Sequence, residues 1–168
     1  MIEYVDTTVF NANAQTIVNT INCVGVMGNG LALEFRLRYP EMYDHYVEQC
    51  KQKKVQIGKP YLYREYVTPW ILNFPTKKHW KYPSKIQWIE QGLKYFVANY
   101  KHGGIKSIAF PKLGCNHGDL DWNDVKSLME KHLRACFLNS RASQGRRSQA
   151  FEHQIDHGGI NPGFTGLS

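Results

Sequence analysis

The apolar residues of this chain follow two spacings in turn, one typical of β-strands and one typical of α-helices. Strands are predicted over residues 2–5, 14–20, 61–67, 70–74 and 105–110, and the third and fourth of them are close enough in sequence to form a hairpin. Helices are predicted over residues 30–39, 40–54 and 85–99 and from Asp121 onward, where Val125, Leu128, Met129, Leu133 and Cys136 recur at helical period. This order predicts an α/β sandwich, whose sites lie at the carboxyl ends of the strands.

Three local signals predict where helices begin and end. Pro40 disfavours helical geometry at the residue before it, so one helix must end near Tyr39. Ser84 and Gln87 have the spacing of a capping box, which predicts that Ser84 caps the helix after it. Asp121 is the N-cap candidate for the last helix.

Residues 140–168 differ in character from the rest of the chain. They are rich in Ser, Gly, Gln and Asn and lack sustained periodicity, so they cannot bury enough apolar surface to offset the entropy cost of ordering. We therefore expect one domain over residues 1–139 and a disordered or atypical C-terminal tail over residues 140–168. A docking segment for a partner and the product of an altered reading frame are the alternatives for this tail.

Composition is that of a globular protein. The 168 residues suit one domain, and 42% of them are apolar. The chain has no run of about 18 apolar residues and begins without a charged and then apolar leader, so we expect a cytoplasmic protein without membrane contact. The cysteines Cys23, Cys50, Cys115 and Cys136 form no CxxC pair or Cys/His cluster, which predicts reduced thiols and no metal.

The distribution of charge indicates a partner. The formal net charge of +7 favours polyanions. One segment interleaves cations with aromatic rings, namely Lys77, Lys78, His79, Trp80, Lys81, Tyr82 and Lys85. Single-stranded nucleic acid is bound by this combination of charged and stacking groups, although a solvated basic loop has the same pattern.

Glycines follow two of the predicted strands. The segment VNTINCVGVMGNGLALEF, residues 18–35, passes from strand-like residues through Gly25, Gly28 and Gly30 into a helix. Glycine lets backbone N–H groups approach an anion, which the helix N-terminus then stabilises, so this segment is either a phosphate site or a tight turn without ligand. A second glycine-bearing loop, PKLGCNHGDLDW, follows the strand predicted over residues 105–110.

Three separated segments together resemble a known family. VNTINCVGVMGNGLALEF, NFPTKKHW and FPKLGCNHGDLDW are similar, in this order, to segments of macrodomains. The similarity is to the DarG antitoxin macrodomains, which are DNA ADP-ribosyl glycohydrolases, and to the terminal ADP-ribose protein glycohydrolases. It covers roughly residues 2–133 and implies a three-layer α/β/α sandwich with a mixed central sheet.

The resemblance also implies a site. Lys77 matches the lysine that the family uses in catalysis, and Asn22 matches an asparagine near the distal ribose, so these two form the expected catalytic set. The expected ligand-binding residues are Cys23, Gly28, Asn29, Gly30, Leu31, Thr76, Leu113, Gly114, Cys115, Asn116, His117, Gly118 and Asp119. The expected DNA contacts are Lys78, His79, Trp80 and Lys81.

The second loop departs from the family pattern. Asn116, His117 and Asp119 replace the Gly, Asn and Gly of the DarG loop. The terminal glycohydrolases have a catalytic aspartate at the position of Gly118, whereas the aspartate of this chain is one place later. An altered loop favours a protein that binds ADP-ribose without turnover.

The resemblance implies an enzyme that binds ADP-ribose and hydrolyses ADP-ribosyl adducts on single-stranded DNA, with thymidine as the modified base. Lys77 then acts at the anomeric carbon, either as a neutral nucleophile or as a charged stabiliser. The alternatives are a non-catalytic reader of ADP-ribose and a glycohydrolase acting on ADP-ribosylated protein carboxylates. The expected partner is a DarT-like transferase toxin, and we expect a monomer without a cofactor.

Overall fold

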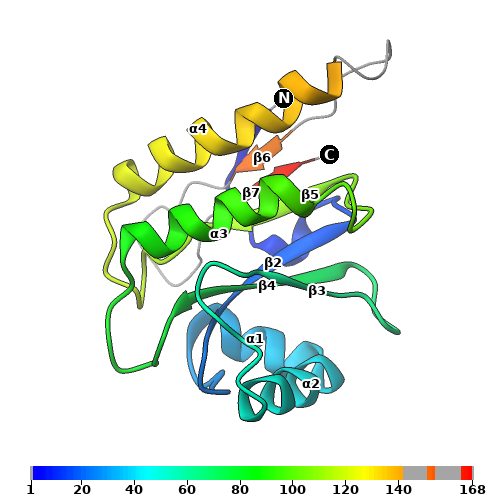
Figure 1. The fold of residues 1–168 in the computed structure, drawn as a ribbon. Helices are drawn as coiled ribbons and strands as arrows, with labels where there is room; N and C mark the ends of the chain where they lie inside the picture. Colours follow the sequence, from blue (N-terminus) through cyan, green and yellow to red (C-terminus); the bar gives the residue numbers. More distant parts are fainter. Residues whose placement is uncertain (1, 142–150, 154–163, 168) are drawn as a thin grey trace.

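The computed structural model describes residues 2–141, 151–153 and 164–167. It has three layers, with a central sheet between two pairs of helices (Figure 1). Helices α1 (Gly30–Arg38) and α2 (Pro40–Lys51) cover one face, and α3 (Ile86–Asn99) and α4 (Trp122–Arg141) cover the other. The predicted three-layer α/β/α sandwich is confirmed.

The middle of the sheet is parallel and buried on both faces. Strand β2 (Thr16–Asn22) lies between β4 (Trp70–Lys77) and β5 (Ile108–Pro111) and pairs with both in parallel. Near-continuous burial along β2 and β4 is what helices on both faces require. Outside β4, β3 (Tyr61–Tyr63) runs antiparallel to it, so the predicted hairpin is confirmed with a shorter first strand, and the sheet is mixed.

The other side of the sheet involves both ends of the chain. Strand β1 (Ile2–Val5) is followed by a short 3-10 helix, Val9–Asn11. Strands β6 (Phe151–His153) and β7 (Phe164–Leu167) pair with β1 and β5, giving the order β1-β6-β7-β5-β2-β4-β3. Residues 142–150 and 154–163 lie outside the described residues, so the tail predicted from residue 140 stays a prediction.

Two apolar cores hold the helices to the sheet. Phe35 of α1 and Met42 and Tyr46 of α2 are fully buried against one face. Leu93 of α3 and Leu133 of α4 are fully buried against the other. The helical spacing in the sequence therefore identified the inward faces correctly.

The predicted start signals of the last two helices had different outcomes. Asp121 Oδ1 accepts hydrogen bonds from the backbone N–H groups of Asn123 and Asp124, at 2.8 and 3.4 Å, as expected of a cap. The capping box at Ser84 is wrong, because α3 has Lys85 at its N-cap and no side-chain cap. Ser84 is buried instead, and its backbone N–H donates to the Gly118 carbonyl oxygen at 2.9 Å.

Within the described residues, no helix is both long enough and apolar enough to cross a membrane. The same part of the chain contains no cluster of three or more His, Cys, Asp or Glu side chains that could hold a metal ion.

Candidate functional site

The predicted site residues follow the carboxyl ends of the three parallel strands. Residues 23–29 follow β2, residues 78–85 follow β4, and residues 112–121 follow β5. We refer to these as the first glycine loop, the basic loop and the second glycine loop. They meet at the carboxyl end of the parallel strands, which is where ligands bind in open α/β folds.

A register shift at the end of the sheet places Lys77 beside Asn22. Ile21 pairs with Pro75, but Asn22 pairs with Lys77, so Thr76 is passed over. The strand has a bulge here, next to a proline that has no N–H to give to the sheet. The Cys23 N–H donates to the Lys77 carbonyl oxygen at 3.1 Å and fixes the first glycine loop to the end of β4.

The Asn22 side chain stabilises the first glycine loop through hydrogen bonds to the loop backbone. Its side chain is 7% exposed, and its Oδ1 accepts from the N–H groups of Val24 and Val26 at 3.1 and 3.3 Å. Its Nδ2 donates to the Val26 carbonyl oxygen at 2.6 Å. These contacts give Asn22 a structural role in the loop, and the catalytic role stays a prediction.

Tyr46 of α2 supports Asn22 and was not singled out from the sequence. Its hydroxyl donates to both the backbone oxygen and Oδ1 of Asn22, at 2.8 and 2.9 Å. Burial raises the pKa of this phenol, so it remains a donor over the physiological pH range. Only its place on the apolar face of α2 was visible in the sequence, and that pattern does not separate a packing tyrosine from a tyrosine that supports a loop.

The first glycine loop leads into the exposed N-terminus of α1. Met27 is fully buried and anchors the loop, whereas Gly28, Asn29 and Gly30 are exposed. The Asn29 Oδ1 caps α1 by accepting from the Gly30 N–H at 2.9 Å. Gly30 has φ of +54°, a backbone conformation that favours glycine. Leu31 follows in the first turn of α1 and is half-buried.

Lys77 is the last residue of β4, which runs three residues beyond the predicted strand end at Phe74. Burial changes along the strand end, where Thr76 is buried, Lys77 half-buried and Lys78 exposed. The Lys77 Nζ donates to the backbone oxygen of Trp80 at 3.3 Å. The Lys77 amine is thus hydrogen-bonded to the backbone of the basic loop.

The second glycine loop is packed tightly on Ser84. A Cβ atom at residue 118 would overlap the Gly114 carbonyl oxygen and lie 2.5 Å from the Ser84 Oγ. A Cβ atom at residue 114 would lie 2.9 Å from Leu120 Cδ1, and Gly114 has φ of +69°. The loop therefore excludes a side chain at residue 118, where the terminal glycohydrolases carry their aspartate.

All three substitutions in this loop, Asn116, His117 and Asp119, are exposed. Asp119 has φ of +60°, a left-handed backbone conformation that favours glycine, and the DarG loop has glycine at this position. The His117 ring lies against the first glycine loop, because a Cβ atom at Gly30 would be 3.1 Å from its Cδ2 and Nε2. The structure thus brings the two glycine loops together, with the imidazole between them. Leu113 is fully buried and Asn116 exposed.

The two loop cysteines are weak nucleophiles. Burial raises the pKa of Cys23 to about 11 and that of Cys115 to about 12. Both thiols are therefore protonated at neutral pH, and a thiolate mechanism is disfavoured.

The basic loop presents aromatic rings and cations to solvent. The rings of His79 and Trp80 are stacked, with centroids 5.4 Å apart, and Tyr82 lies 5.6 Å from His79. Lys81 Nζ lies 5.2 Å from the Trp80 ring centroid. Trp80 is 49% exposed and Tyr82 65% exposed, so both rings are accessible to a partner.

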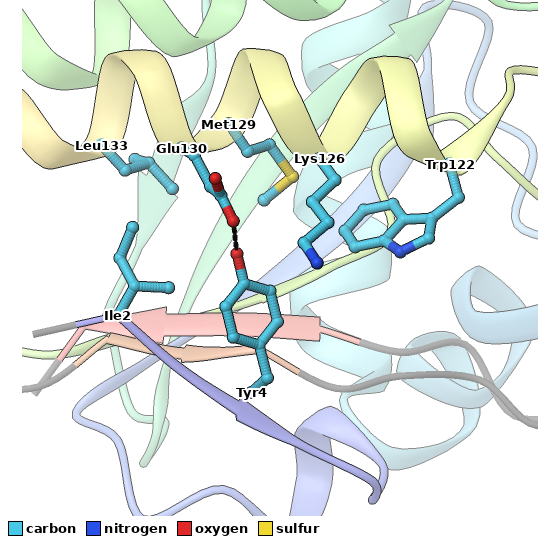
Figure 2. A pocket seen from close by; sticks show the side chains of 7 residues that line it. All are labelled: Ile2, Tyr4, Trp122, Lys126, Met129, Glu130 and Leu133. Atoms are coloured by element: carbon cyan, nitrogen blue, oxygen red, sulfur yellow. Dashed lines mark hydrogen bonds between the residues drawn. The ribbon is translucent and has the colours of Figure 1, made fainter.

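A narrow crevice with no room for a water molecule lies elsewhere, between β1 and α4. Figure 2 shows Tyr4 reaching from β1 to Glu130 of α4, with a hydrogen bond between them. Lys126 lies over the Tyr4 ring, with Nζ 4.7 Å from the centroid. None of the predicted site residues lines this crevice. We therefore place the candidate site at the loops and not here.

The order of elements defines an α/β/α sandwich whose two glycine loops follow the carboxyl ends of neighbouring parallel strands. Residues 18–129 match the model of the Macro domain family. This chain belongs to the macrodomain family.

Several relatives have names that state an activity. The chain is 41% identical over 138 residues to a DNA ADP-ribosyl glycohydrolase of Thermus aquaticus, a match that covers 80% of this chain and 38% of the relative. The macrodomain of Mycobacterium tuberculosis DarG is 38% identical with a TM-score of 0.78, covering 94% of this chain and 99% of that one. Thermosipho africanus DarTG, solved in complex with ADP-ribose, is 42% identical with a TM-score of 0.75, covering 78% and 38%. The chain thus spans about two fifths of the length of the curated relatives it matches.

Proposed function

We propose that this protein binds ADP-ribose and hydrolyses ADP-ribosyl adducts on single-stranded DNA, with thymidine as the modified base. The observation that carries this proposal is the pairing of Asn22 with Lys77 at the carboxyl edge, flanked by the two glycine loops. The names of the relatives support it, because the Thermus aquaticus protein is a DNA ADP-ribosyl glycohydrolase and the Thermosipho africanus protein was solved with ADP-ribose.

The two glycine loops would hold the diphosphate. Gly28, Asn29 and Gly30 are exposed beside the N-terminus of α1, where backbone N–H groups and the helix dipole favour an anion. His117 of the second glycine loop lies against Gly30 and borders this region on that side. The loops supply binding, and the reacting groups come from the strand ends between them.

Hydrolysis would break the bond between the anomeric carbon and the base nitrogen. Water supplies the hydroxyl that ends on the anomeric carbon, and its proton ends on the departing base. We assign the catalytic role in this step to Lys77, which pairs with Asn22 at the end of β4. Its amine either attacks the carbon and is later displaced by water, or remains charged and stabilises the transition state.

The basic loop accounts for a DNA substrate. Exposed Trp80 and the His79 ring stacked on it can receive a base, and Lys78 and Lys81 can receive phosphates. We assign these four residues to the DNA, as the resemblance implied. The same substrate would make the protein the antitoxin of a DarT-like transferase.

The test is release of ADP-ribose from an oligonucleotide that carries ADP-ribosyl-thymidine. We expect turnover by the wild-type protein and a loss of about a hundredfold or more in Lys77→Ala, since removal of one transition-state contact has this effect. Lys106→Ala is the matched control, because Lys106 is an exposed lysine that precedes β5, at the end of that strand opposite the loops. Free ADP-ribose should bind Lys77→Ala about as well as wild type.

Two outcomes would replace this proposal. The first is ADP-ribose binding without turnover on any adduct, which would make the protein a reader, as the altered second loop favours. Release from ADP-ribosylated protein but not from DNA would instead make it a carboxylate glycohydrolase. Retained turnover in Lys77→Ala would contradict the assigned mechanism.

A further inference from the structure

One indole on α3 lies close to the lysines at the two ends of the basic loop. Trp88 is half-buried in the first turn of α3. Lys78 Nζ lies 5.6 Å from its ring centroid and Lys85 Nζ lies 5.4 Å from it. A lysine ammonium at this distance is attracted by the negative face of the indole. The ring therefore lies close to both ends of the basic loop, which connects β4 to α3 (Figure 1).

This lysine pair is not neutralised within the described chain. Neither Lys78 nor Lys85 forms an ion pair with a described residue, and the first turn of α3 contains no acidic residue. Glu90, further along α3, is engaged by Lys94 and His132 at 3.2 Å each. Two lysines held near one ring concentrate positive charge there, so an anion bound near the ring would be attracted to both.

We infer that Trp88 positions Lys78 and Lys85 as a seat for a backbone phosphate of single-stranded DNA, so that the strand leaves the site over the first turn of α3. The inference rests on the proposed function, which supplies the DNA. The surface then has two parts. The His79–Trp80 stack receives a base, and the lysine pair receives a phosphate beside it.

Trp88 is a positioning residue in this arrangement, and its test must separate positioning from packing. The assay is fluorescence anisotropy with an unmodified, labelled single-stranded oligothymidylate at several salt concentrations. The variants are Trp88→Leu, Trp88→Phe and the double variant Lys78→Gln/Lys85→Gln. Trp70→Leu is the matched control, because Trp70 holds Arg64 at 5.5 Å from its ring centroid at the opposite end of β4.

We expect Trp88→Leu to weaken oligonucleotide binding about five- to tenfold, as the loss of two exposed cation–π contacts implies. The plot of log affinity against log salt should flatten, by up to about 1.4 for two contacts worth about 0.7 each. The double lysine variant should flatten it by that full amount. Trp88→Phe should recover part of the affinity, and Trp70→Leu should behave as wild type.

Unchanged affinity and slope in Trp88→Leu would overturn the inference. If that variant does not fold, Trp88→Phe decides, since it should bind DNA more weakly than wild type while its melting temperature is retained. Calorimetry with free ADP-ribose separates this inference from the proposed function. Wild-type protein that binds ADP-ribose but no DNA overturns the phosphate seat alone, whereas wild-type protein that binds no ADP-ribose contradicts the proposed function itself.

Discussion

Replacing Gly118 with alanine tests the packing of the second glycine loop. The new Cβ would lie 2.5 Å from the Ser84 Oγ and would overlap the Gly114 carbonyl oxygen. Real Cβ contacts are longer than 3.0 Å, so one of these groups must move by half an ångström or more. The Ser84 hydroxyl can rotate, but the Gly114 oxygen belongs to the backbone and accepts from the Leu120 N–H at 3.1 Å. The loop must therefore distort.

Overpacking of this kind costs about 1–3 kcal/mol. We expect Gly118→Ala to lie at the upper end, at about 2–3 kcal/mol, because backbone must yield and a hydrogen bond is weakened. For a chain of this size the melting temperature should fall by roughly 5–10 °C. Binding of ADP-ribose should weaken at least about tenfold, which corresponds to about 1.4 kcal/mol.

Melting curves and calorimetry measure both effects, and Gly28→Ala is the matched control for the melting curves. A Cβ atom at Gly28 has Val26 Cγ1 as its nearest neighbour, at 3.7 Å, so that variant should melt as the wild type does. Adding Ser84→Ala to Gly118→Ala should not restore stability, because the backbone overlap remains. Wild-type melting and affinity in Gly118→Ala would refute the reasoning, and the loop would then have room for the aspartate that the terminal glycohydrolases carry.

Three further changes probe other parts of the site. Tyr46→Phe removes both hydroxyl contacts to Asn22 and should cost about 1–3 kcal/mol of unfolding free energy while weakening ADP-ribose binding; unchanged affinity would show that the first glycine loop does not need this support. Asp119→Gly relieves a φ of +60° and should raise the melting temperature by about 1–2 °C, and a decrease would mean that the carboxylate makes contacts that outweigh the strain. Cys23 and Cys115 should react with a thiol reagent at pH 7 about a hundredfold or more slowly than free cysteine, with rates that rise as the pH approaches their pKa values of about 11 and 12; fast reaction at neutral pH would contradict the burial of these thiols.

The sequence predicted the layers because each helix has a regular apolar face. The spacing of Val125, Met129 and Leu133 identified the inward side of α4, and all three are buried. Asp121 was a correct cap because its hydrogen bonds are local, within three residues. Patterns that depend on neighbouring residues were therefore sufficient for the secondary structure.

Contacts between distant segments were not predictable in this way. Ser84 has the local signature of a cap, but its backbone bonds to Gly118 from a different loop, and this tertiary contact prevails. Tyr46 and Trp88 were not singled out from the sequence, since only the fold brings Asn22 to Tyr46 and Lys78 to Trp88. The resemblance predicted which residues belong to the site, and the structure shows what holds those residues in place.

The bulge at Thr76 makes the number of residues between Phe74 and Lys77 decisive for the position of Lys77. Thr76 is the residue that the pairing passes over, so a chain without it could still pair Lys77 with Asn22 directly after Pro75. An added residue would instead carry Lys77 past that pairing and turn its side chain to the opposite side. We therefore expect a one-residue insertion after Thr76 to abolish the proposed turnover in a protein that still folds and the deletion of Thr76 to be milder, and grafts of the site onto other macrodomains must not lengthen the segment between Pro75 and Lys77.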